Sequence, residues 1–145
     1  MKALLTSISI LIWGFTSLAQ GYSSKTLSHD WALEKGWFGD EQIVMHVLDS
    51  SRTKDLTTVF TFNYSGILSH SLYNPSHLGL CGNGLLYLDV STWEVKDNVI
   101  IFDVKGGHFA DDQFHYIMTY SITGMDRGQM TLKKKEVKLN EKKNF

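Results

Sequence analysis

The sequence predicts an all-β protein, built as an eight-stranded antiparallel barrel of the up-and-down type. Short segments in which apolar and polar residues alternate run from Trp31 almost to the C-terminus, and this period of two is typical of half-buried strands. After residue 20, no segment has the apolar spacing of a long helix. Short turn sequences separate the strands, and closing such a meander removes the sheet edges that invite aggregation.

The N-terminal residues 1–19 are predicted to be a cleaved signal peptide. Lys2 supplies a basic start, residues 3–15 are mainly apolar, and Ser17 and Ala19 are the small residues that precede a cleavage site. The apolar run is shorter than the roughly 20 residues that span a bilayer. Because no cysteine stands at the cut, we expect an exported protein, periplasmic or secreted, without a lipid anchor.

The remainder reads as one domain, in which residues 20–27 form a flexible lead-in, residues 28–136 the barrel and residues 137–145 a basic tail. The chain has 14 basic and 15 acidic residues, a balance that gives no general attraction to nucleic acid. The single cysteine, Cys81, excludes an intramolecular disulfide. We interpret it as a small buried hydrophobe, with a reactive or intermolecular thiol as the alternative.

Each strand has its own pattern. The predicted strands are one beginning near Trp31, then 43–48, 56–62, 67–72, 85–90 with an extension through Trp93 and Val95 left open, 99–104, 113–123 and 129–135. The sixth strand pattern is dense in isoleucine and valine, and residues 105–107 are expected to close it. Residues 63–66 and Asp97-Asn98 are expected to form turns. The longest irregular segment, 74–84, and the loop 105–112 are candidates for functional contacts.

The clearest strand, 113–123, defines an inner face. One side carries the apolar residues Phe114, Tyr116, Met118, Tyr120 and Ile122. The other side carries the polar residues Gln113, His115, Thr119 and Ser121, as successive side chains of a strand point to opposite faces.

Several framework residues resemble those of a known family. They are Trp31, Phe60-Thr61-Phe62, Gly66, Cys81, the run from Asp89 to Trp93, the run from Asn98 to Ile101, and Tyr120 to Ile122 followed by Leu132 to Lys134. Over residues 28–136 the chain resembles the lipocalin-like domain proteins exported by Bacteroidetes, which have a calycin-like β-barrel. The resemblance implies that Trp31 plugs the closed end and that Arg127 stacks over it, although His29 stands where the family often has glycine.

The interior of such a barrel decides the function. Eight strands leave room either for side chains alone or for one small ligand. The cavity candidates are Phe60, Phe62, His70, Tyr116, Met118 and Tyr120. We therefore predict an exported, non-enzymatic protein that binds a small apolar or amphipathic ligand. The alternative is an envelope interaction protein with a filled barrel that uses its loops to contact a protein partner.

Metal binding and catalysis find little support. His77, His108 and His115 could meet at one mouth of the barrel beside Asp111 and Asp112, but no HxH or HExxH spacing occurs. The sequence also lacks a G-x-S-x-G elbow, a P-loop and a G-x-G-x-x-G fingerprint. We therefore expect no metal, no cofactor and no enzymatic activity.

The C-terminal lysines form the one patch of the sequence in which charges of a single sign predominate. They are Lys133, Lys134, Lys135, Lys138, Lys142 and Lys143. A solvated strand end is the usual meaning of such a run. Its functional alternative is a weak contact with an anionic membrane surface.

Overall fold

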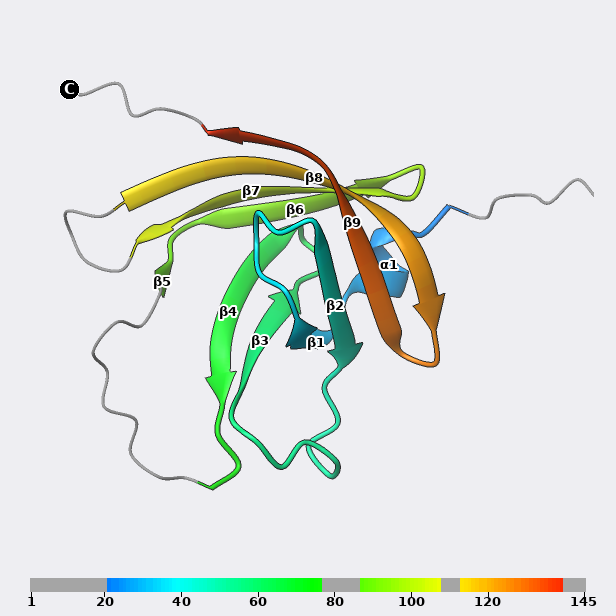
Figure 1. The fold of residues 1–145 in the computed structure, drawn as a ribbon, viewed down its shortest axis with the longest axis vertical. Coiled ribbons are helices and arrows are strands. Elements are labelled where there is room, and N and C mark those ends of the chain that lie inside the picture. The colour runs from blue at the N-terminus through cyan, green and yellow to red at the C-terminus, as the bar shows by residue number, and fades with distance from the viewer. Residues whose placement is uncertain (1–20, 77–86, 108–112, 140–145) are drawn as a thin grey trace, which may run out of the picture.

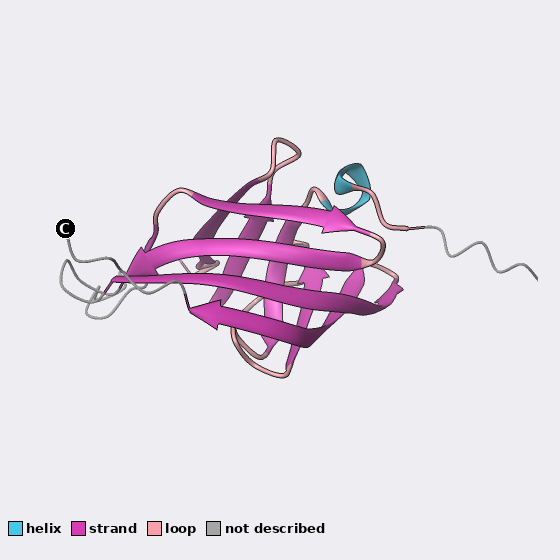
Figure 2. Cartoon of the chain, turned by 90° about the horizontal axis from the view of Figure 1, so that it is seen from above, coloured by secondary structure: helices cyan, strands magenta, loops and turns pink. Residues whose placement is uncertain are grey.

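The computed structural model describes residues 21–76, 87–107 and 113–139 (Figures 1 and 2). The elements are α1 (Ser24–Leu27), β1 (Asp30–Lys35), β2 (Gln42–Val47), β3 (Thr57–Phe62), β4 (Ile67–Tyr73), β5 (Tyr87–Leu88), β6 (Ser91–Lys96), β7 (Val99–Gly107), β8 (Gln113–Asp126) and β9 (Gln129–Leu139). The prediction of an all-β fold is confirmed. Figures 1 and 2 show β6, β7 and β8 crossing β2, β3 and β4 at a steep angle.

The strands close into an antiparallel ring, in the order β1-β2-β9-β8-β7-β6-β4-β3 and back to β1. The short strand β5 pairs with the same edge of β7 as β6 does, since Leu88 lies opposite Gly106 and Thr92 opposite Asp103. Together β5 and β6 form one interrupted strand, which gives the ring eight strands. The predicted eight-stranded antiparallel barrel is therefore confirmed.

From β3 to β9, with β5 and β6 counted as one strand, each strand pairs with the strand that follows it in the sequence, as in an up-and-down barrel. The β1–β2 hairpin completes the ring, but in it β2 lies next to β9, and β1 lies between β2 and β3. Because β2 and β3 both run antiparallel to β1, residues 48–56 must carry the chain past β1. Hydrogen bonds mark this path, from the Leu48 amide to the Asp30 carbonyl at 2.8 Å and from the Tyr73 hydroxyl to the Ser50 carbonyl at 3.3 Å.

Alternating residues of the strands fill the core. Its largest fully buried side chains are Trp31, Tyr120, Phe60, Phe62 and Phe102. The predicted inner face of β8 is confirmed, because Met118 and Tyr120 are buried and Phe114 and Tyr116 pack against the same cluster. Burial of apolar surface at about 25 cal/mol per Å² makes this cluster the main source of stability.

One end of the barrel is closed by the segment expected to be a flexible lead-in. Residues 24–27 instead form α1, whose amide at Thr26 is capped by the Ser23 hydroxyl at 3.2 Å. Leu27 is fully buried, and its carbonyl accepts a hydrogen bond from the Trp31 indole at 2.8 Å. Because folding removes the Leu27 side chain from water, the hydrophobic effect stabilises this short polar segment against the barrel.

The closing pair implied by the resemblance does not form. Trp31 is fully buried beneath α1, whereas the side chain of Arg127 is 93% exposed. Arg127 lies in the β8–β9 turn with a φ of 47°, and this turn leaves the guanidinium in solvent.

Two predicted turns are confirmed, and several strands are longer than predicted. Gly66 has a φ of 85°, and Asp97 and Asn98 both have positive φ, as tight hairpin turns require. Gly106 was expected to close the sixth strand but belongs to β7. A Cβ at this position would lie 2.2 Å from the Tyr87 carbonyl, so glycine allows β5 to approach β7. β9 extends to Leu139, so residues 137–139 are strand and not tail.

A candidate ligand cavity

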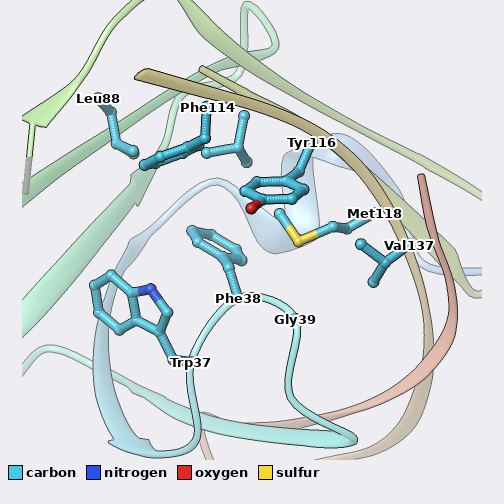
Figure 3. Close-up of a pocket in the computed structure, with 9 residues that line it drawn as sticks. Trp37, Phe38, Gly39, Leu88, Phe114, Tyr116, Met118 and Val137 are labelled. Carbon is cyan, nitrogen blue, oxygen red and sulfur yellow. The ribbon is translucent and has the colours of Figure 1, made fainter. Parts of the chain in front are cut away.

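A cavity of about 360 Å³ lies inside the barrel, at the end opposite α1 (Figure 3). Its lining comes from the β1–β2 turn and from β5, β7, β8 and β9, and consists of Trp37, Phe38, Gly39, Leu88, Val104, Phe114, Tyr116, Met118 and Val137. β1 starts beside α1 and ends before this turn. The turn therefore lies at the far end of the barrel, where it meets the cavity.

The β1–β2 turn, residues 36–41, folds into the barrel and forms the floor of the cavity. The Phe38 ring lies 4.7 Å from Phe60 and 5.1 Å from Phe102, and the Trp37 ring lies 5.5 Å from Phe60. Such distances are those of packed aromatic pairs. The turn thus separates a filled core, on the α1 side, from an open cavity on the other.

Two side chains from distant strands hold this turn at Gly39. The Gly39 amide donates to the Tyr120 hydroxyl at 2.8 Å, and the Lys134 ammonium donates to the Gly39 carbonyl at 3.0 Å. Lys134 also forms an ion pair with Glu41. Burial raises the pKa of Tyr120, so the phenol stays protonated near neutral pH while it accepts this hydrogen bond.

Glycines make the inward fold possible. Gly36 and Gly39 have φ values of 80° and 97°, in the left-handed region that side chains disfavour. A Cβ on Gly36 would also lie 2.2 Å from the carbonyl oxygen of Gln42. Only glycine fits at this position.

The side chains that line the cavity are apolar, apart from the hydroxyl of Tyr116 and the indole nitrogen of Trp37. Figure 3 shows the Tyr116 hydroxyl inside the ring of lining side chains, near Phe38. The rings of Phe114 and Tyr116 pack together at 5.3 Å. Among the lining residues in the described part of the chain, none is charged. An apolar wall with few polar groups suits a small organic molecule.

The structure brings two of the six predicted cavity residues to this space. Tyr116 and Met118 line it. Phe60, Phe62 and Tyr120 lie in the core cluster instead. Their aromatic rings fill the part of the barrel that the turn closes off.

His70 is half-buried on β4, with its ring 6.1 Å from Phe60. Burial lowers the pKa of His70. It is not among the residues that line the cavity.

The sequence interpretation missed the residues of the floor. Trp37 and Phe38 lie between Gly36 and Gly39, and an aromatic pair in a turn is a signal that the turn is buried. Leu88, Phe114 and Val137 were also not selected as cavity residues. They belong to strand ends whose position over a cavity depends on the register of the sheet.

The hypothetical metal ligands do not form a described site. His77, His108, Asp111 and Asp112 lie outside the described residues, as does Cys81. His115 alternates with Phe114 and Tyr116, so it is on the outer face of β8, where its Nε2 lies 2.7 Å from Asp103 Oδ1. Within the described ranges, no group of three or more His, Cys, Asp or Glu residues is placed to hold a metal.

Comparisons with known proteins give one short match. No family model and no solved structure matches the chain. A curated protein of Arabidopsis thaliana, named "Putative F-box protein", is 47% identical over 36 residues, which are 25% of this chain and 10% of that protein. The chain thus spans about a tenth of the length of the curated protein that it matches. This local similarity shows no family, and the lipocalin-like assignment stays a prediction.

In the described part of the chain, no helix has the length and apolar character needed to cross a bilayer.

Proposed function

We propose that this protein binds a small apolar or amphipathic molecule in the cavity and does not transform it. The observation that carries the proposal is the cavity of about 360 Å³ with an apolar wall. Pockets for small ligands start at roughly 300 Å³ and combine a mainly apolar lining with a few polar groups. The Tyr116 hydroxyl is the group that would orient a polar end of the ligand.

The cavity volume limits the size of the ligand. A cavity of about 150 Å³ holds one benzene molecule, so the space above Phe38 suits a compact molecule of about two ring-sized groups. A long extended chain would have to displace the aromatic floor. We therefore favour compact ligands over long acyl chains.

The proposal also places the protein in the lipocalin-like family and outside the cytoplasm, in the periplasm or the medium. The closed eight-stranded antiparallel barrel supports the family. The pattern of residues 1–19 supports export. Neither rests on a matched relative.

The alternative function is an envelope protein with a filled barrel that contacts a protein partner through its loops. The core on the α1 side is filled, but the space beyond Phe38 favours ligand binding. Most of the loops 74–84 and 105–112 lies outside the described residues.

Native mass spectrometry of protein purified gently from an expressing cell tests the proposal first. A reproducible extra organic mass would support it. The purified protein is then titrated with 1-anilinonaphthalene-8-sulfonate, a compact amphipathic fluorescent probe, and competed with short and long fatty acids.

The matched variants for this titration are Leu88→Trp and Val90→Trp. Leu88 lines the cavity, whereas Val90 is 72% exposed and does not. We expect Leu88→Trp to abolish probe binding and Val90→Trp to preserve it. Equal binding by both variants, or no binding by the unmodified protein, would rule out the cavity as the site.

A further inference from the structure

One edge of β9 is paired along its whole length, whereas the other edge is paired only in part. Its β8 edge is paired as far as Leu139 opposite Tyr116. Its other edge pairs with β2 only up to Lys133, and the last hydrogen bond there joins the Lys134 amide to the Glu41 carbonyl at 2.9 Å. β2 cannot continue, because the residues before it turn into the barrel as the cavity floor. In the described part of the chain, residues 135–139 therefore have one open edge.

This open edge, residues 135–139, is exposed throughout. Val137 is 36% and Leu139 is 57% exposed, although they lie opposite the inward-facing Met118 and Tyr116. The inner positions of β9 nearer its start, Met130 and Leu132, are fully buried. Within the described residues, the end of β9 thus presents an apolar inner face and one edge without a partner strand.

The charges beside the open edge are mainly positive. Among the described residues at this end of β9, Lys133, Lys135 and Lys138 are exposed. Two acidic residues lie beside them, since Glu136 pairs with Lys138 at 3.3 Å and Glu41, just before β2, pairs with Lys134. A second copy of the chain would bring like charges together, and lysines on edge strands commonly prevent such self-pairing. An acidic strand would be attracted by the same lysines.

We propose that the open edge is a docking site for an extended acidic segment of a partner protein, which adds a strand beside β9. Such strand addition takes its affinity from main-chain hydrogen bonds and its specificity from alternate side chains. The partner segment would place apolar residues beside Val137 and Leu139, and acidic residues beside Lys135 and Lys138. An anionic membrane would satisfy the lysines but would leave the backbone groups of the edge without strand partners.

The docking site differs from the cavity, although Val137 belongs to both. The two proposals are therefore separable, since Leu88→Trp blocks the cavity from β5. We expect this variant to bind a docked segment as the unmodified protein does.

The probe is a fluorescein-labelled six-residue peptide that alternates valine and glutamate, titrated by fluorescence anisotropy. Two comparison peptides are the same sequence with N-methylated valines, which cannot donate hydrogen bonds, and one with lysine in place of glutamate. The protein variants are Lys135→Glu with Lys138→Glu, and the control Lys25→Glu with Lys96→Glu. The control lysines are exposed on α1 and at the end of β6, so both variants change net charge equally.

We expect the acidic peptide to bind, with slower amide exchange at residues 135–139, and the N-methylated peptide not to bind. The edge variant should weaken binding of the acidic peptide about tenfold and should favour the lysine peptide, because opposite charges on neighbouring strands attract each other and like charges repel. The control variant should change little. Equal binding of the N-methylated peptide, equal effects of both variants, or absence of binding would overturn the proposal. So would a dimer of the chain that buries residues 135–139, detected by light scattering and amide exchange.

Discussion

Replacing Tyr120 by Phe tests how the cavity floor is held. The substitution removes one hydroxyl oxygen from a fully buried ring and leaves the ring in place. The Gly39 amide, which donates to that oxygen at 2.8 Å in a part-buried setting, then loses its acceptor. An unsatisfied buried donor costs about 1–3 kcal/mol. Because solvent can partly reach Gly39, we expect a loss of about 1–2 kcal/mol in the free energy of unfolding.

The matched control is Tyr116→Phe. Tyr116 presents its hydroxyl to the cavity, and this hydroxyl has no hydrogen-bond partner within the described residues. Its loss should therefore change the free energy of unfolding by less than about 0.5 kcal/mol. Urea denaturation followed by tryptophan fluorescence measures both variants. Tyr116→Phe should weaken binding of an amphipathic ligand instead. Equal stability losses in the two variants, or no loss in Tyr120→Phe, would refute the role of Tyr120 in holding the floor.

Three further predictions concern pH, the turn and α1. Burial lowers the pKa of His70 below its ordinary value of 6.5, so as the pH falls the unfolded chain takes up a proton on this histidine before the folded chain does. The contribution of His70 to the free energy of unfolding should therefore be complete above about pH 6.5 and decrease at lower pH. In urea titrations at pH 7.5 and 5, His70→Leu should reduce this decrease. Gly36→Ala should lower the free energy of unfolding by about 3 kcal/mol or more, because φ is positive and the new Cβ would collide with the Gln42 carbonyl. Gly39→Ala should lower it by about 1–2 kcal/mol, because φ is positive there too but the space around Gly39 is open. Similar losses in the two variants would contradict the role of the collision at Gly36. Leu27→Ala should cost about 2–5 kcal/mol in thermal or urea unfolding because the side chain is fully buried, and a neutral result would mean that α1 does not close the barrel.

Local patterns explain why most strands could be predicted. The alternation around Phe114 to Ile122 and the Asp97-Asn98 turn are properties of neighbouring residues, so they are visible without the fold. Strand ends were predicted less well. β9 continues to Leu139 because the long strand β8 pairs with it that far, and nothing in a stretch of lysines indicates that partner.

The candidate site was predicted only in part. Tyr116 and Met118 follow from the inner face of β8, but that face alone does not show where the filled core ends. Phe60 has the same pattern and lies in the core because Phe38 and Trp37 pack against it. The boundary between the filled core and the cavity depends on the β1–β2 turn, and the alternation of apolar and polar residues along the strands gives no information about that turn.

The sequence by itself determined the all-β class, the faces of the strands and the glycines that allow sharp turns, because these depend on residues a few positions apart. Only the tertiary structure decided that β1 lies between β2 and β3, that the β1–β2 turn folds inward, and that no other described strand pairs with the second edge of β9 at residues 135–139. The inward turn is held by Tyr120 and Lys134, which are 81 and 95 residues from Gly39. Contacts between residues so far apart form only when the barrel closes, so the cavity is a property of the closed barrel and not of any single segment.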